Sequence, residues 1–125
     1  MDSVVHFELP FEDAAKIKAF YGNVFGWHML QIDPGYYMAT TAASDERGLP
    51  KEPGAINGGF KKRIDAEETP VIVIRVASVE DAVQKATDAG GKIILPRQTI
   101  GEWGIYARIT DPEGNLVGLW EEKKK

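Results

Sequence analysis

Residues 20–27 read Phe20-Tyr21-Gly22-Asn23-Val24-Phe25-Gly26-Trp27 and mark the point where a helix gives way to a strand. Together with Ile17, their apolar side chains recur at helical spacing and predict a helix over residues 12–25, with acids in its first turn. Gly26 ends the helix, because glycine readily adopts the left-handed conformation that closes many helices. We expect the aromatic side chains of this stretch, Phe20, Tyr21, Phe25 and Trp27, to pack between the helix and a sheet.

The flanking segments complete a unit of one strand, one helix and three strands. A strand over residues 4–9 precedes the helix, and a strand over residues 27–32 follows it. A turn at residues 33–35 leads into a hairpin strand over residues 36–40. A polar loop over residues 42–53 then precedes a strand over residues 54–61. Gly58 and Gly59 in this last strand indicate close backbone approach or room for a ligand.

The second half of the chain repeats this order. Residues 70–76 predict a strand, and Ser78 to Asp81 resemble a capping box that opens a helix. Glycines end this helix at positions 90 and 91, which lie 64 and 65 residues after Gly26. Strands are predicted over residues 92–95, 103–110 and 116–121, with a tight turn at residues 111–115 before the last one.

The repeat predicts an α+β fold of two βαβββ modules that form a cupped mixed sheet. The modules cover residues 3–62 and 69–122 of a single domain spanning residues 1–125. Residues 122–125 form a charged tail ending in Lys123, Lys124 and Lys125. We expect the two modules to share a cavity.

Composition excludes several classes of function. The 125 residues are 43% apolar and include two histidines and no cysteine, which excludes disulfides, thiolate metal sites and a cysteine nucleophile. The net charge of −4 gives no basic surface for nucleic acid. We expect no signal peptide and no membrane span, and therefore a cytoplasmic protein.

Four features together resemble the vicinal oxygen chelate superfamily. They are the paired modules, the Phe20-Tyr21 pair, the Phe25-Gly26-Trp27 run and the Asp-Pro-Glu-Gly-Asn turn at residues 111–115. The superfamily includes glyoxalase I, the bleomycin and fosfomycin resistance proteins and extradiol dioxygenases. The resemblance covers residues 4–121. It implies a glyoxalase-like domain, a homodimer, and a divalent metal that chelates two neighbouring oxygens of a substrate.

The metal-ligand positions implied by this resemblance are mostly vacant. His6 matches the ligand of the first strand, but its counterpart in the second module is Val71. The last-strand positions are Gly118 and, give or take one residue, Gly58. One imidazole falls short of the three or so protein ligands that a divalent metal needs, so we expect no metal cofactor. The alternative is a divalent metal ion held by His6, Glu8 and Glu121, although strand alternation directs Glu121 to the opposite face.

Strand alternation also predicts which side chains line the cavity: His6, Glu8, Phe60, Val73, Arg75 and Trp120, with Tyr106 and Arg108 as further candidates. His6 and Glu8 are the catalytic candidates, because they can exchange protons near neutral pH. Phe60, Arg75, Tyr106, Arg108 and Trp120 are the ligand-binding candidates. The structural alternative for His6 is a half-buried histidine bonded to the backbone or to a tyrosine hydroxyl. His28 is interpreted as a surface or interface residue.

Three functions remain open at this stage. The first is metal-free binding of a small organic molecule in the cup of a homodimer. The second is a divalent-metal-dependent lyase or dioxygenase that uses His6 with Glu8 or Glu121. The third is a dimeric interaction module with a vestigial pocket. The sequence leaves open whether the protein is an enzyme.

Overall fold

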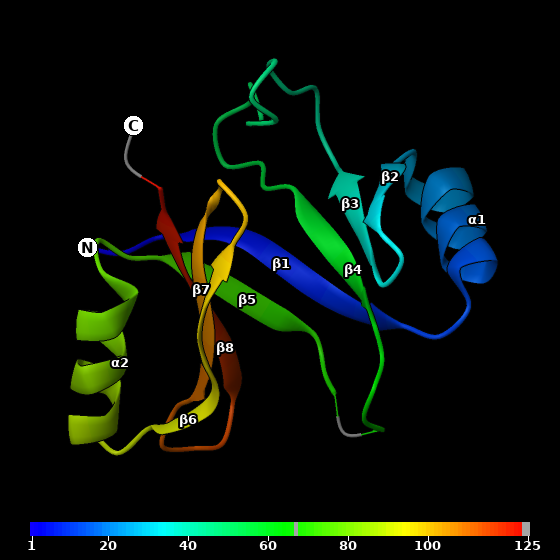
Figure 1. The fold of residues 1–125 in the computed structure, drawn as a ribbon. Helices are drawn as coiled ribbons and strands as arrows, with labels where there is room; N and C mark the ends of the chain where they lie inside the picture. The colour runs from blue at the N-terminus through cyan, green and yellow to red at the C-terminus, as the bar shows by residue number, and fades with distance from the viewer. Residues whose placement is uncertain (67, 124–125) are drawn as a thin grey trace. The chain divides into compact units, whose positions relative to one another are not determined.

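The computed structural model describes residues 1–66 and 68–123 (Figure 1). Lys124 and Lys125 of the predicted tail lie outside the described residues. The chain divides into two compact units. Residues 6–70 are called the N-terminal unit, and residues 1–5 with those from 71 onward are called the C-terminal unit. The first strand has its initial residues in the C-terminal unit and the rest in the N-terminal unit.

The N-terminal unit is a four-stranded sheet with one helix. Its elements are β1 (Val4–Phe11), α1 (Ala14–Phe25), β2 (His28–Asp33), β3 (Tyr36–Thr40) and β4 (Gly58–Lys62). The strands lie in the order β2-β3-β4-β1, in which β1 and β4 are parallel and the other pairs antiparallel. Residues 54–57 were predicted as part of the last strand but lie outside it, because the preceding loop continues to Asn57.

Helix α1 is capped at both ends; its stop at Gly26 was predicted, whereas its start is two residues later than expected. Asp13 is the N-cap, and its carboxylate accepts a hydrogen bond from the Lys16 amide at 3.2 Å. The prediction of acids in the first turn is therefore wrong, because Glu12 and Asp13 precede the helix. Gly26 follows the helix with φ 75°, a left-handed conformation that glycine adopts without strain.

The core of the N-terminal unit lies between α1 and the sheet. Phe11, Ala39 and Phe60 are buried at its centre, and Tyr21 and Trp27 pack against them. The predicted core positions Phe20 and Phe25 are instead 53% and 59% exposed. They contact Tyr21 and each other at the outer side of the helix, which is a correction to the sequence-based assignment.

The C-terminal unit repeats the arrangement. Its elements are β5 (Val71–Arg75), α2 (Val79–Asp88), β6 (Lys92–Ile100), β7 (Gly104–Thr110) and β8 (Leu116–Glu122). The strands lie in the order β5-β8-β7-β6. Ser78 caps α2, accepting a hydrogen bond from the Asp81 amide at 3.2 Å. Strand β6 is longer than predicted and continues through Pro96, where its register against β7 shifts.

The core of this unit lies between α2 and one face of its sheet, around Val79, Ala107 and Leu119. The α+β class and the repeated βαβββ order are thus confirmed. Among the described residues, no helix has both the length and the apolar character needed to cross a lipid bilayer.

Candidate functional site

His6 and Glu8 of β1 are joined by a tyrosine hydroxyl from β3. Nε2 of His6 lies 2.9 Å from the Tyr36 hydroxyl, which donates to Oε2 of Glu8 at 2.9 Å. Strand alternation puts His6 and Glu8 on the same face of the sheet, because they are two positions apart. That face is opposite the core, since their neighbours Phe7 and Leu9 pack against the α1 side. The two catalytic candidates are therefore brought together, and Tyr36 connects them.

The surroundings of this hydrogen-bonded chain favour a neutral His6. Burial lowers the pKa of His6 below its ordinary value of 6.5, and the nearby charge of Glu8 opposes that shift in part. Glu8 itself is buried, with 7% of its surface exposed. An uncharged imidazole in this position can exchange protons or accept a hydrogen bond near neutral pH.

The tyrosine ring has room because the strand beneath it carries glycine. A Cβ atom built at Gly59 would meet the hydroxyl and ring of Tyr36 closer than real Cβ contacts allow. Gly59 pairs with Glu8 in the β1–β4 register, on the same face as the carboxylate. The neighbouring Gly58 faces the core, where the Phe7 ring covers it. The space left by the two glycines is thus filled by aromatic rings of the same unit.

The sequence did not single out Tyr36 as a functional residue. It predicted only that this residue starts the hairpin strand, and a tyrosine at a strand end has no motif. The available signal was the Gly58-Gly59 pair, which predicted close backbone approach or room for a ligand, whereas the Phe7 and Tyr36 side chains occupy that space. The alternative interpretation of His6 had included a tyrosine hydroxyl as its partner, and the structure has that bond.

A second tyrosine and glycine occur together in the C-terminal unit. The Tyr106 hydroxyl accepts a hydrogen bond from Nε of Arg108 at 2.8 Å, and the guanidinium also lies 5.7 Å from the centre of the tyrosine ring. Arg108 is buried, with 7% of its surface exposed. A Cβ built at Gly118 would lie 2.8 Å from the Tyr106 hydroxyl. Two ligand-binding candidates are therefore in direct contact.

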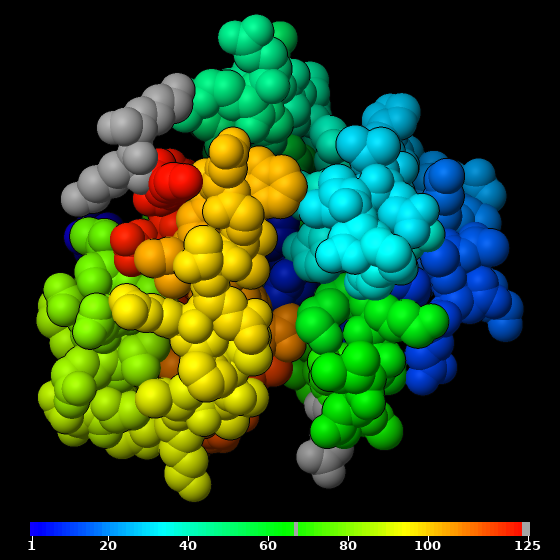
Figure 2. All heavy atoms as spheres, in the orientation of Figure 1, coloured from blue at the N-terminus to red at the C-terminus, as the bar shows by residue number. Residues whose placement is uncertain are grey.

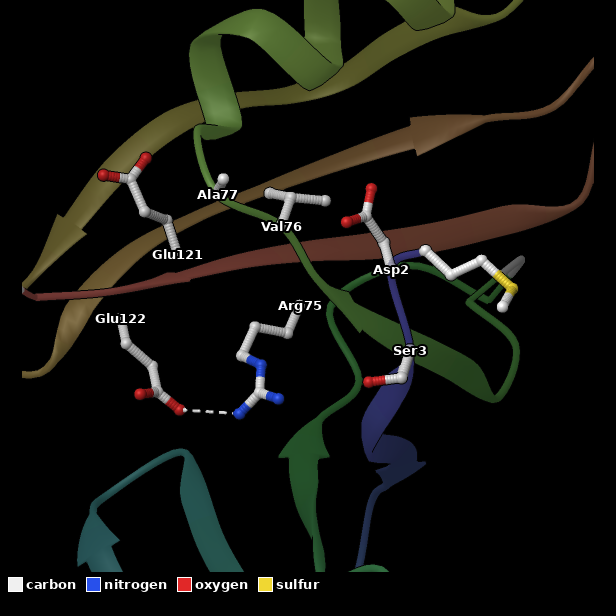
Figure 3. A pocket seen from close by; sticks show the side chains of 8 residues that line it. Asp2, Ser3, Arg75, Val76, Ala77, Glu121 and Glu122 are labelled. Atoms are coloured by element: carbon white, nitrogen blue, oxygen red, sulfur yellow. Dashed lines mark hydrogen bonds and ion pairs between the residues drawn. The ribbon is translucent and has the colours of Figure 1, made fainter.

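Arg75 and Trp120 are neighbours on the same face of this sheet. They are partners in the β5–β8 register, and the Trp120 ring packs over Gly104. Arg75 lines a hollow of about 330 Å³ in the C-terminal unit, and its guanidinium lies 3.4 Å from Glu122 (Figure 3). About half of each side chain in this pair is exposed, so the pair contributes little stability. The complete lining of the hollow is Met1, Asp2, Ser3, Arg75, Val76, Ala77, Glu121 and Glu122.

Two of the predicted site residues have other roles. Phe60 was placed with His6, but its side chain is fully buried on the α1 side of the sheet. The prediction failed because the glycine that faces Glu8 is Gly59, one residue from the expected position. Glu121 accepts a hydrogen bond from the Val79 amide at 2.8 Å, so its carboxylate caps the start of α2.

The metal implied by the resemblance requires a set of His, Asp or Glu ligands. Residues 1–66 and 68–123 contain no group of three or more His, Asp and Glu side chains placed to hold a metal ion. His6 and Glu8 already bond to Tyr36, and Glu121 bonds to α2. Val71 is buried and apolar. These side chains do not fit a divalent ion, which needs about three protein ligands.

Comparison with curated proteins finds a relative of about twice this length. The chain is 32% identical over 126 residues to the protein called "Putative glyoxylase CFP32" in Mycobacterium bovis and in Mycobacterium tuberculosis. The match covers 94% of this chain and 44% of each relative. The chain therefore spans less than half the length of these curated relatives.

Solved structures share the fold. Hypothetical protein BH1468 from Bacillus halodurans matches with a TM-score of 0.68 and 15% identity, covering 99% of this chain and 96% of that one. Methylmalonyl-CoA epimerase from Mycobacterium tuberculosis matches with a TM-score of 0.65 and 15% identity, covering 97% and 88%. The family model described as Glyoxalase/Bleomycin resistance protein/Dioxygenase superfamily matches residues 3–119. The chain therefore belongs to the glyoxalase/bleomycin resistance protein/dioxygenase superfamily.

Proposed function

We propose that this protein binds a small organic molecule at the His6–Tyr36–Glu8 group and does so without a metal ion. The observation that carries the proposal is the hydrogen-bonded chain itself. It places an imidazole, a hydroxyl and a carboxylate together on the sheet face opposite the core. Ligand pockets combine a few fixed polar groups of this kind with apolar surroundings.

The metal-free part of the proposal rests on the chemistry of the donors. A divalent ion at His6 would need the carboxylate of Glu8 and at least one further ligand. Gly59 contributes no ligand atom, and the Tyr36 ring fills the space above it. Glu121, the third ligand of the metal-dependent alternative, is bonded to the backbone of α2.

Metal content tests this part. The full chain is purified without chelators, its metal content is measured, and it is titrated with zinc, nickel and manganese. His28→Ala is the matched control for His6→Ala, because these are the only two histidines and His28 is exposed. We expect substoichiometric metal in both variants and in the unmodified chain. Stoichiometric metal that His6→Ala removes and His28→Ala retains would overturn the proposal.

Ligand binding is tested by titrating the chain with a panel of aromatic, hydroxylated and acidic metabolites. The three tryptophans provide a fluorescence signal. We expect at least one class to bind, with affinity lowered by Tyr36→Phe and unchanged by Tyr37→Phe. Tyr37 is a suitable control because it packs against the core on the opposite face. A panel without any response would contradict the proposal.

A homodimer is the assembly that we propose for the active protein. The curated relatives are more than twice as long as the matched segment, so a second copy of this chain would provide a comparable amount of structure. Light scattering coupled to size-exclusion chromatography measures the mass directly. A mass equal to one chain of 13.8 kDa at working concentration would contradict the dimer.

A further inference from the structure

Hydrogen-bond directions in the His6–Tyr36–Glu8 group fix the tautomer of His6. A carboxylate only accepts hydrogen bonds, so the single hydroxyl proton of Tyr36 points to Glu8. The Tyr36 oxygen therefore accepts from Nε2–H of His6 at 2.9 Å. In a neutral imidazole with its proton on Nε2, Nδ1 carries a lone pair and acts as an acceptor.

Nδ1 is the second polar atom of the His6 ring. No hydrogen bond to this atom occurs within residues 1–66 and 68–123, where the only polar contact of the ring is Nε2 with Tyr36. Every fully buried side-chain nitrogen and oxygen in the same part of the chain has a partner. Nδ1 lacks one, so it keeps some solvent-accessible surface on a side chain that is half-buried.

This group offers an acceptor and no proton to an incoming molecule. The Nε2 proton is committed to Tyr36, and the Tyr36 proton is committed to Glu8. An anionic ligand at Nδ1 would bring its own lone pair against that of the imidazole. A hydroxyl or amine N–H would instead donate to it. The chemistry therefore selects a donor and disfavours a carboxylate.

An apolar strip lies beside the group on the same face of the sheet. Leu30 pairs with Met38, Met38 pairs with Gly59, and Gly59 pairs with Glu8 in one row across the four strands. Leu30 is 68% exposed and Met38 is half-buried. The β2–β3 hairpin that carries both lies at the surface, coloured cyan in Figure 2. An apolar ligand body on this strip would gain by leaving water.

We propose that the ligand of this site is an uncharged molecule with an apolar body and a hydroxyl or N–H group, which donates to Nδ1 of His6 while the body extends toward Met38. This inference rests on the proposed function, since it names the class of ligand for the same site. Phenols and hydroxylated aromatic or aliphatic compounds have this chemistry. Simple carboxylates lack it.

Three matched probes test the donor requirement: para-ethylphenol, its methyl ether para-ethylanisole, and para-ethylbenzoate. They share an apolar body and differ in the polar end, which is a donor, a weak acceptor or an anion. Binding is followed by the imidazole nitrogen signals of the full chain carrying His28→Gln, in which His6 is the only histidine. We expect the phenol to shift the Nδ1 signal and to bind about five- to tenfold more tightly than the ether, as one neutral hydrogen bond allows.

Two variants check that the preference comes from the tautomer. Tyr36→Phe removes the acceptor of the Nε2 proton, so the tautomer is no longer fixed and the preference for phenol over ether should fall. Tyr37→Phe should retain it. Equal binding of ether and phenol, or tightest binding of the benzoate, overturns the inference while leaving ligand binding at the site intact. If none of the probes moves the His6 signals, this inference fails, whereas the proposed function fails only if the wider metabolite panel also gives no response.

Discussion

The substitution Gly59→Ala tests whether Tyr36 depends on the absence of a side chain at position 59. A Cβ at this position would overlap the hydroxyl and ring of Tyr36, which must then move. Moving it breaks the bond to the Glu8 carboxylate and the bond from His6. A hydrogen bond to a charged group contributes about 1.5 to 3 kcal/mol and a neutral one about 0.5 to 1.5 kcal/mol. We therefore expect Gly59→Ala to lower the free energy of unfolding by about 2 to 4 kcal/mol.

Gly35→Ala is the matched control in the same unit. A Cβ at Gly35 would lie 3.7 Å from the Cβ of Lys62, an ordinary contact, and the residue does not have a positive φ. The expected change is within about 0.5 kcal/mol. Urea denaturation measures both free energies. The Nε2–H signal of His6 in the proton spectrum should be present in Gly35→Ala and lost in Gly59→Ala.

A double-mutant cycle with Tyr36→Ala separates this contact from a general effect on the strand. Once the ring is absent, Gly59→Ala should cost less than about 1 kcal/mol, because nothing remains for the new methyl group to displace. If Gly59→Ala lowers the free energy of unfolding by the same amount with and without Tyr36, the effect comes from the β4 backbone and the role assigned to Tyr36 is refuted. A cost below about 1 kcal/mol in the unmodified chain would refute it as well.

Three further predictions concern other contacts. Burial lowers the pKa of His6, so the contribution of the neutral His6 side chain to stability is complete above pH 6.5 and is lost as the pH falls. The free energy of unfolding should therefore decrease less steeply with falling pH in His6→Asn than in the unmodified chain. Glu121→Ala should cost about 1 kcal/mol by removing the acceptor at the start of α2, whereas Glu122→Ala, which loses only an exposed ion pair, should be close to neutral in urea denaturation. Asn57→Ala should cost about 1 to 3 kcal/mol and make residues 42–53 sensitive to limited proteolysis, because this buried amide bonds to Thr41, Ser44 and Gly48 across the loop. Equal cleavage of the loop with and without Asn57 would contradict that role.

The features of the fold that follow local rules were predictable from sequence. Gly26 ends α1 and Ser78 caps α2 as expected, because each depends on the conformation or side chain of a single residue. The end of the loop before β4 was not predictable in this way. It is set by Asn57, whose amide bonds depend on residues up to 16 positions away.

Strand alternation alone predicts which candidate side chains of one strand share a face of the sheet. His6 and Glu8 share a face because they are two residues apart in one strand, and Tyr106 and Arg108 meet for the same reason. Phe60 was assigned to the wrong face of the sheet. Its face depends on the register between β1 and β4, and the sequence of one strand does not specify that register. The expected counterpart of Gly118 was Gly58, give or take one residue; the glycine that faces Glu8 is Gly59, and this shift of one residue puts Phe60 on the core face.

Tyrosine at position 36 has a physical reason that the shorter hydroxyl side chains do not meet. A half-buried imidazole N–H needs an acceptor, and a buried carboxylate needs a donor. One hydroxyl oxygen serves both, because it accepts from His6 and donates to Glu8. Serine and threonine have the same group but are too short to reach across β4 from β3, whereas the tyrosine ring spans that strand over Gly59. Tyrosine and glycine thus act as a pair: the glycine leaves room for the ring, and the hydroxyl oxygen bonds to both polar groups.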